Sequence, residues 1–142
     1  MGLERAPYYV TDGAGVAFVL GGLNLTTRDY ARMGQLYLNK GFYNGKQIVP
    51  AEWVAASTAA SAPTQTGEIS YGYQWWIPLG AEDEFIAQGI YGQFIYVDPS
   101  NDLVIVKNSA NSRYTDKSQQ WPAKHLAMFR AISQHFSQTT LP

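Results

Sequence analysis

The stretch GGLNLTTRDYARMG, residues 21–34, contains the clearest local structural signals in the chain. Thr26 and Asp29 have the spacing of a capping box, in which one side chain caps the start of a helix and the other reaches back to the cap residue. Leu25 and Tyr30 occupy the two positions whose apolar side chains often meet across such a cap. The pattern therefore predicts a helix that begins at about residue 27.

This helix is expected to cover about residues 27–40, because Gly41 can adopt the left-handed conformation in which many helices end. Farther along, Asn44-Gly45 favours a turn, since both residues tolerate a positive φ. Pro50 favours a second, short helix over about residues 50–57, and a loop is expected to follow as far as residue 67. Three residues of the first helix recur at helical spacing and predict a buried face: Tyr30, Met33 and Tyr37.

The chain between about residues 70 and 108 is rich in aromatic and β-branched residues, which favour strands. The sequence Asp98-Pro99-Ser100-Asn101-Asp102 is a strong turn signal between the last two of these strands. Such short connections favour an antiparallel meander, because parallel strands need a longer crossover. Strands are expected over residues 70–77, 84–91, 93–97 and 103–108.

A C-terminal helix is expected over about residues 122–138, beginning at Pro122. The order of helices and strands, without an internal repeat or a charged linker, predicts one α+β unit over residues 1–142. Residues 1–7 are expected to lie inside a longer protein rather than at a natural start. The inner face of the C-terminal helix is predicted to consist of Leu126, Phe129, Ile132, Ser133 and Phe136.

The composition excludes several classes of protein. Apolar residues make up 46% and charged residues 15% of the 142 residues, which is typical of a globular chain with a packed core. The net charge of -1 comes from scattered charges, so nucleic-acid binding is not expected. Neither a membrane span nor a signal peptide is expected, since no long apolar run occurs. The absence of cysteine is compatible with either an oxidising or a reducing compartment, so localisation stays open.

The sequence offers little for metal or cofactor chemistry. His125 and His135 are ten residues apart, almost three helical turns, which is too far for both to bind one ion. The sequence contains no Gly-x-Ser-x-Gly motif and no glycine-rich phosphate loop followed by lysine. No metal site and no cofactor are therefore expected.

Trp75 and Trp76 leave two interpretations open. Neighbouring residues of a strand point to opposite faces, so one indole could lie in the core while the other lines a cleft. Large aromatic side chains commonly fill cores, which is the structural interpretation. The functional interpretation is that they contact an apolar or amide substrate or a sugar.

Taken together, several segments resemble the β-lactamase-related serine hydrolases of the penicillin-binding superfamily. The first is the Gly21–Gly34 stretch, the second is GKQIVPAEW at residues 45–53, and the third is YGYQWW at residues 71–76. Because the segments occur in the family's order over nearly the whole chain, the resemblance implies the C-terminal part of the β-lactamase/transpeptidase-like fold. Gly89-Ile90-Tyr91-Gly92-Gln93 resembles the branch of the 6-aminohexanoate-dimer hydrolases and related esterases.

The resemblance implies acyl transfer by a nucleophilic serine in a Ser-x-x-Lys motif, with a tyrosine from a Tyr-x-Asn loop. This chain contains no serine followed three positions later by lysine. Tyr37-Leu38-Asn39 matches Tyr-x-Asn in letters, but its position near the end of a helix explains Tyr37 as a packing residue.

The family's third motif, a basic residue followed by Thr or Ser and Gly, would fall on Ala87-Gln88-Gly89. With Ala87 in place of the basic residue, contact with a β-lactam carboxylate is not expected, which favours esters or linear amides as substrates. By the resemblance, Gly89 leaves room for the substrate and the backbone N–H of Ile90 is the oxyanion-hole donor. Residues expected to contact the substrate are Ala87, Gln88, Tyr91, Trp75 and Trp76. The structural alternative is that Gly89 and Gly92 only allow a strand to bend.

Three hypotheses follow from the sequence. The first is that the chain supplies the oxyanion-hole strand and a pocket wall of a serine hydrolase but lacks its nucleophile. The second is a non-catalytic binding module with the same cleft, and the third is a self-associating fragment of the same fold. In each case the chain is expected to pair with the missing N-terminal part or with another copy, because the family's sheet takes its first strands from that part.

Overall fold

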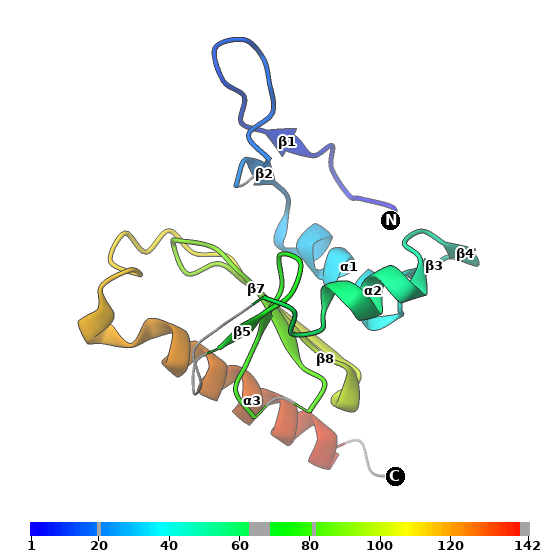
Figure 1. Cartoon of the computed structure of the whole chain (residues 1–142), viewed down its shortest axis with the longest axis vertical. Helices are drawn as coiled ribbons and strands as arrows, with labels where there is room; N and C mark the ends of the chain where they lie inside the picture. The colour runs from blue at the N-terminus through cyan, green and yellow to red at the C-terminus, as the bar shows by residue number, and fades with distance from the viewer. Residues whose placement is uncertain (20, 63–68, 81, 140–142) are drawn as a thin grey trace.

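The computed structural model describes residues 1–19, 21–62, 69–80 and 82–139. Its centre is a five-stranded antiparallel sheet with helices on both faces (Figure 1). The α+β fold class predicted from the sequence is confirmed. Within the described residues, no helix is long and apolar enough to cross a membrane. Of the loop expected up to residue 67, residues 63–67 lie outside the described residues.

Helix α1 (Thr27–Leu38) begins where the capping pattern predicts, and Thr26 caps it by accepting a hydrogen bond from the Asp29 N–H. The helix ends two residues earlier than predicted, because Lys40 already has a left-handed φ of 51° and is followed by Gly41 at 83°. Helix α2 (Ala51–Ser57) is the second short helix. Between the helices, β3 (Phe42–Tyr43) and β4 (Lys46–Gln47) form a hairpin around the Asn-Gly turn.

The central sheet has the strand order β5-β6-β7-β8-β9. Each strand pairs antiparallel with its neighbours in sequence, as the short connections predict. Between β8 and β9 the chain forms a short 3₁₀ turn, η1 (Pro99–Asn101), at the predicted position. The strands are β5 (Ser70–Tyr71), β6 (Trp76–Ile77), β7 (Phe85–Gln88), β8 (Phe94–Asp98) and β9 (Leu103–Lys107).

The single strand predicted over residues 70–77 is wrong. The chain reverses at residues 72–75, so that β5 and β6 pair with each other. Gly72 explains the reversal, because its backbone lies against the carbonyl of Ser57 at a distance that no Cβ would tolerate. Gln74 completes the turn with a left-handed φ of 68°. The strand expected over residues 84–91 is also shorter, since residues 89–92 form a turn.

The sheet is sandwiched between α1 and helix α3 (Trp121–Thr139), which lie on opposite faces. Strand β8 shows the alternation that this arrangement requires. Its side chains at positions 94 and 96 pack with Phe129 of α3, whereas those at 95 and 97 pack with Met33 and Tyr37 of α1. The core is therefore two apolar layers separated by one sheet.

The predicted inner face of α3 is correct except at its end. Phe129 and Ser133 are almost completely buried, but Phe136 is 53% exposed. Phe136 lies three residues beyond Ser133, the last buried residue among those of α3 whose burial is described.

A hairpin that the sequence did not predict extends from the body of the molecule (Figure 1). It is formed by β1 (Tyr8–Tyr9) and β2 (Leu23–Asn24). The hairpin has an unusually apolar surface, which makes it a candidate for contact with another protein segment. Its exposed apolar residues are Tyr8, Tyr9, Val10, Val16, Phe18 and Val19.

Candidate active site

A cavity of about 450 Å³ lies at the end of the sheet where β7 finishes and the strand β2 passes the start of α1. This volume is within the range of small-molecule sites. All of its lining residues are uncharged, so a ligand here meets apolar groups, hydroxyls and carboxamides. The lining residues are Val19, Gly21, Leu23, Asn24, Leu25, Tyr30, Ala87, Gln88, Gly89, Gln93, Phe94, Ile95, Asn108 and Ser109.

Two hydrogen bonds join the walls of the cavity through the first turn of α1. The Tyr30 hydroxyl donates to the Leu23 carbonyl over 2.6 Å. The Asn108 carboxamide, one residue beyond β9, donates to the Thr27 hydroxyl over 2.9 Å. Burial raises the pKa of Tyr30, which keeps the hydroxyl protonated as the donor. The first turn of α1 therefore fixes β2 on one side of the cavity and the end of β9 on the other.

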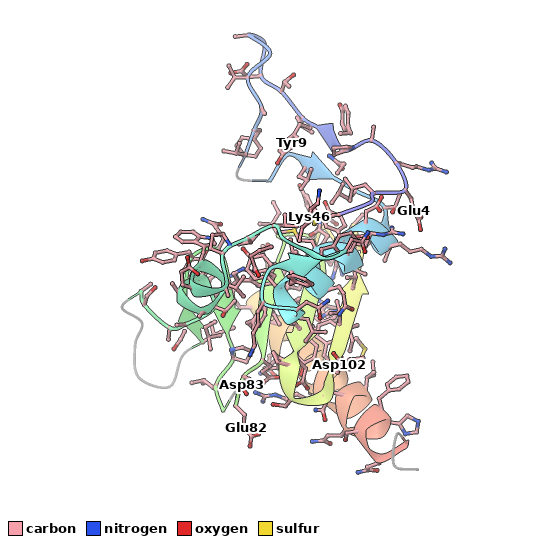
Figure 2. The ribbon with its side chains drawn as sticks, turned by 90° about the vertical axis from the view of Figure 1, so that its right-hand side faces the viewer. Glu4, Tyr9, Lys46, Glu82, Asp83 and Asp102 are labelled. Atoms are coloured by element: carbon pink, nitrogen blue, oxygen red, sulfur yellow. The ribbon has the colours of Figure 1, made fainter. Side chains whose placement is uncertain are left out.

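Asp29 anchors the N-terminal segment to the same turn of α1. Its fully buried carboxylate accepts a hydrogen bond from the Glu4 N–H at 2.9 Å, from Arg32 at 2.6 Å and from the Thr26 hydroxyl at 2.9 Å. The backbone donor of Glu4 is the largest cause of a lowered Asp29 pKa, and it outweighs burial, which acts in the opposite direction. Figure 2 shows Glu4 close to α1.

Asp29 thus departs in part from the predicted capping box. Its side chain accepts from the Thr26 hydroxyl and the Glu4 N–H, whereas a capping box would have it bind the Thr26 backbone N–H. The reason is that the Glu4 N–H and Arg32 compete for the carboxylate. This contact spans 25 residues, so no local pattern could have predicted it.

The turn that follows β7 carries the predicted oxyanion-hole donor. The Gly89 N–H donates to the Gln93 carbonyl at 2.9 Å, and the Gly92 N–H donates to the Gly89 carbonyl at 3.1 Å. The Tyr91 N–H donates to the Gln93 side-chain oxygen at 2.9 Å. Within the described part of the chain, the Ile90 N–H has no hydrogen-bond acceptor.

Of the residues predicted to form the site, the structure brings Ala87, Gln88 and Gly89 together in the cavity wall. Ile90 and Tyr91 continue directly from this wall in the exposed turn, with 67% and 48% of their surfaces accessible, but they do not line the cavity. The glycines also have the alternative structural role, because Gly92 has a φ of 76° and lies against the Tyr114 ring.

The two tryptophans lie away from the cavity. Trp75 is 3% exposed and packs between the rings of Tyr37 and Phe85, with centroid distances of 4.7 and 4.9 Å. Trp76 packs on the opposite face of the sheet, in the layer beneath α3. Packing in the core therefore accounts for both tryptophans. Neither Trp75 nor Trp76 is among the described residues that line the cavity. Tyr37 likewise packs in the core, as its helical spacing indicates.

Sequence reasoning missed several cavity residues. Asn108 was predicted only as the end of a strand and Tyr30 only as a packing residue. The Asn108 contact to Thr27 spans 81 residues, so its place in the site depends on the tertiary fold. Gln93 had a signal, since it ends the Gly-Ile-Tyr-Gly-Gln segment, but nothing in that segment indicates what its side chain contacts.

A second, smaller cavity of about 240 Å³ lies at the other end of the sheet, near the residues Glu82, Asp83 and Asp102 labelled in Figure 2. Its floor is a buried polar network in which the Tyr96 hydroxyl donates to Glu84 over 2.5 Å and Arg130 forms an ion pair with Glu84. The Glu84 carboxylate is therefore satisfied by protein donors. Among the residues that the structure describes, no group of three or more acidic or histidine side chains could hold a metal ion.

Comparison with known proteins finds similar proteins that carry the name of one hydrolase. The 6-aminohexanoate-dimer hydrolase of Paenarthrobacter ureafaciens is 34% identical over 116 residues, which are 75% of this chain and 30% of that protein. A solved structure named "Putative 6-aminohexanoate-dimer hydrolase from Bacillus anthracis" is 38% identical, with a TM-score of 0.80 over 96% of this chain and 36% of that one. The chain is a homologue of 6-aminohexanoate-dimer hydrolases.

This homology confirms the resemblance to the β-lactamase-related hydrolases and the β-lactamase-like fold. The present chain spans only 30% of the length of the curated hydrolase and 36% of the length of the solved chain. An uncharacterised protein of Alkalihalophilus pseudofirmus is 28% identical over 96 residues, which are 58% of this chain and 29% of that protein. No family model matches the chain.

Proposed function

We propose that this chain supplies the oxyanion-hole strand and one pocket wall of a serine hydrolase that cleaves ester or amide bonds through an acyl-enzyme. The observation that carries the proposal is the Ile90 N–H, which has no acceptor within the described chain and directly follows the cavity wall at Gly89. The homologous proteins of two organisms carry the name of a hydrolase, which supports the same reaction class.

The chemistry requires a donor such as this N–H. When a serine attacks an ester or amide carbonyl, the carbonyl oxygen becomes an oxyanion that needs fixed hydrogen-bond donors. A backbone N–H serves here whatever the side chain is, which explains how Ile can occupy the position. Gly89 has no Cβ, and the Gln93 carboxamide lies where a Cβ would stand.

The lining of the cavity favours an uncharged acyl group. Ala87 stands where the family's pattern has a basic residue, and none of the described residues that line the cavity is charged. A substrate carboxylate would lose its hydration without gaining an ion pair, which is costly. Esters and linear amides have polar groups that the carboxamides of Asn24 and Asn108 can bind.

The nucleophile has to come from outside this sequence, because no serine in it has a lysine three positions later. A Ser-x-x-Lys segment of a longer hydrolase would supply both the nucleophile and its base. By itself the chain is then a pocket wall without a reacting group.

Contact with such a segment, or with another copy, is supported by two surfaces. Strand β9 pairs only with β8 among the described strands, so its outer edge is open to another strand. The hairpin of β1 and β2 exposes six large apolar side chains. Light scattering of the purified chain is expected to show a dimer or a larger species. A monomer at high concentration with a well-dispersed NMR spectrum would contradict this.

A non-catalytic binding module is the second candidate, and one observation favours it: a ligand-sized cavity in a chain without the nucleophile motif. The two candidates differ in what a longer protein containing the chain does. A hydrolase turns over esters or linear amides, whereas a binding module retains them unchanged.

The experiment compares the purified chain with a longer protein that contains it and a Ser-x-x-Lys segment. The chain alone is expected to leave p-nitrophenyl esters and nitrocefin unhydrolysed and to resist a fluorophosphonate probe, which labels only an activated hydroxyl. The longer protein is expected to hydrolyse esters or linear amides and to be labelled. Stoichiometric labelling of a serine in the chain alone would contradict the proposal, as would a longer protein that binds but never hydrolyses.

A further inference from the structure

The turn over residues 89–93 binds three of its five backbone donors internally. Three of its N–H groups, those of Gly89, Tyr91 and Gly92, are bound within the turn at 2.9 to 3.1 Å. Of the other two, the Ile90 N–H has no acceptor in the described part of the chain. Because Ile90 is exposed, its N–H is accessible to solvent or to a bound group.

The direction of the Ile90 N–H follows from peptide geometry. The Ile90 N–H and the Gly89 carbonyl belong to one planar trans peptide group, in which N–H and C=O point in opposite directions. The Gly89 carbonyl points into the turn, where it accepts from the Gly92 N–H. The Ile90 N–H must therefore point out of the turn.

Gln93 makes two of the three bonds that hold this conformation. Its carbonyl accepts from the Gly89 N–H, and its side-chain oxygen accepts from the Tyr91 N–H. To do so, the carboxamide lies against Gly89 so closely that a Cβ on Gly89 would collide with it. Gln93 also lines the cavity, so it supports the turn from the substrate side.

Other contacts hold the turn from its far side. The Lys107 ammonium donates to the Gly92 carbonyl over 3.0 Å, and the Asn111 N–H donates to the Tyr91 carbonyl over 3.1 Å. The Tyr114 ring lies against Gly92. None of these three contacts is made to the peptide groups on either side of Ile90. On the cavity side, the Gln93 side chain holds one of these groups through the Tyr91 N–H.

We propose that Gln93 is a positioning residue, whose side-chain oxygen fixes the Ile90–Tyr91 peptide and so keeps the Ile90 N–H free and directed out of the turn. The inference rests on the proposed function of Ile90 as the oxyanion donor. It adds that Gly89 is required because it leaves space for the Gln93 carboxamide, in addition to any space it leaves for substrate.

Amide hydrogen exchange of the ¹⁵N-labelled chain tests the inference without any need for activity. In the wild type, the Tyr91 amide is expected to be protected and the Ile90 amide to exchange freely. Gln93→Met, of similar length but without the carboxamide oxygen, is expected to reduce Tyr91 protection about tenfold, the effect of losing one hydrogen bond. Gln93→Glu keeps an acceptor and is expected to retain that protection, which a purely packing role for the side chain does not predict.

Gly89→Ala is the second variant, because its Cβ displaces the carboxamide while Gln93 stays in place. It is expected to reduce Tyr91 protection as Gln93→Met does. Unchanged protection of the amides in β8 and β9 serves as the control for an intact fold. If Tyr91 protection survives in both Gln93→Met and Gly89→Ala, or if Ile90 is protected in the wild type, the inference is wrong.

Turnover in a longer hydrolase that contains the chain separates this inference from the proposed function. Gln93→Met is expected to lower kcat about tenfold with little change in KM, because a misplaced donor weakens transition-state binding. A full kcat in Gln93→Met, in a protein that Ile90→Pro inactivates, would overturn the inference and leave the proposed function standing. Full turnover in Ile90→Pro would overturn the proposed function, and the exchange pattern would still decide the role of Gln93.

Discussion

The buried polar side chains differ in whether the fold supplies them with hydrogen-bond partners. Asp98, which is 7% exposed, accepts hydrogen bonds from the Ser133 hydroxyl at 2.6 Å and the Asn101 carboxamide at 2.9 Å. Tyr114 is 4% exposed, yet its hydroxyl has no partner in the described part of the chain. Burial raises the pKa of Tyr114 to about 12, as expected for a phenol whose anion is not stabilised.

Removing the Tyr114 hydroxyl is therefore expected to be neutral or to stabilise the chain. Tyr114→Phe keeps the ring that packs against Gly92 and Phe94 and removes an unsatisfied donor, for a gain of up to about 1 kcal/mol in the free energy of unfolding. Urea unfolding measures this. Tyr96→Phe is the matched control, since its hydroxyl donates to Glu84 and its loss should destabilise the chain by about 1 to 3 kcal/mol. A similar loss in Tyr114→Phe would mean that its hydroxyl has a partner.

At the scale of elements, the close approach of α1 to the sheet depends on Gly34. A Cβ at this position would lie 2.6 Å from Cγ1 of Val104 and 3.0 Å from Cγ2 of Ile95. Both neighbours are β-branched residues of the sheet, which have few rotamers with which to move aside. Glycine has a lower helix propensity than alanine, but here it allows the helix backbone to pack closely on β8 and β9. This packing determines where the first turn of α1, with Thr27 and Tyr30, lies relative to the cavity.

Gly34→Ala is expected to destabilise the chain by about 1 to 3 kcal/mol, the usual cost of overpacking a core, despite a better helix propensity. Thermal or urea unfolding measures the change. Combining it with Val104→Ala should recover part of the loss, because the smaller side chain removes the collision. Stabilisation by Gly34→Ala alone would show that α1 can shift from the sheet at little cost.

The elements were predictable where their signals are local. Thr26 as the cap of α1, the Asn44-Gly45 turn and the Asp98–Asp102 turn each depend on neighbours within a few residues. The reversal at Gly72 was missed because it depends on the Ser57 carbonyl, which only the tertiary fold brings there. The cavity was predictable only along β7, at Ala87, Gln88 and Gly89, because its other walls come from α1, β2 and the end of β9.

At the scale of the whole molecule, two buried carboxylates with lowered pKa values link stability to pH. The pKa of Asp29 is lowered chiefly by the Glu4 N–H. For Asp98, burial acts to raise the pKa, but hydrogen bonds from Ser133 and Asn101 outweigh it and the pKa is lowered. A carboxylate with a folded-state pKa below its unfolded value binds protons more weakly in the folded state. Its contribution to stability is therefore present above about pH 4 and is lost as the pH falls through the folded-state pKa.

Acid unfolding is expected to reflect this linkage, with the free energy of unfolding falling as the pH drops below about 4. Ser133→Ala removes a donor to Asp98, so it should destabilise the chain by about 1 to 3 kcal/mol at neutral pH and raise the pH at which it unfolds. Unfolding followed by circular dichroism between about pH 7 and pH 2 measures both the free energy of unfolding and the acid midpoint. Ser137→Ala, on an exposed part of the same helix, is the control and should change neither quantity. An unchanged acid midpoint in Ser133→Ala would contradict the assignment.

The function proposed for this chain depends on the Ile90 N–H as the donor that the chain contributes to catalysis. The decisive measurement is the turnover number of Ile90→Pro and Ile90→Val in a longer hydrolase that contains the chain. Ile90→Val keeps the N–H and should retain most of the activity, whereas Ile90→Pro removes it and should lower kcat by about a hundredfold or more. If Ile90→Pro folds normally and keeps full turnover, Ile90 is not the oxyanion donor, and Gly89 and Gly92 serve only to bend the strand.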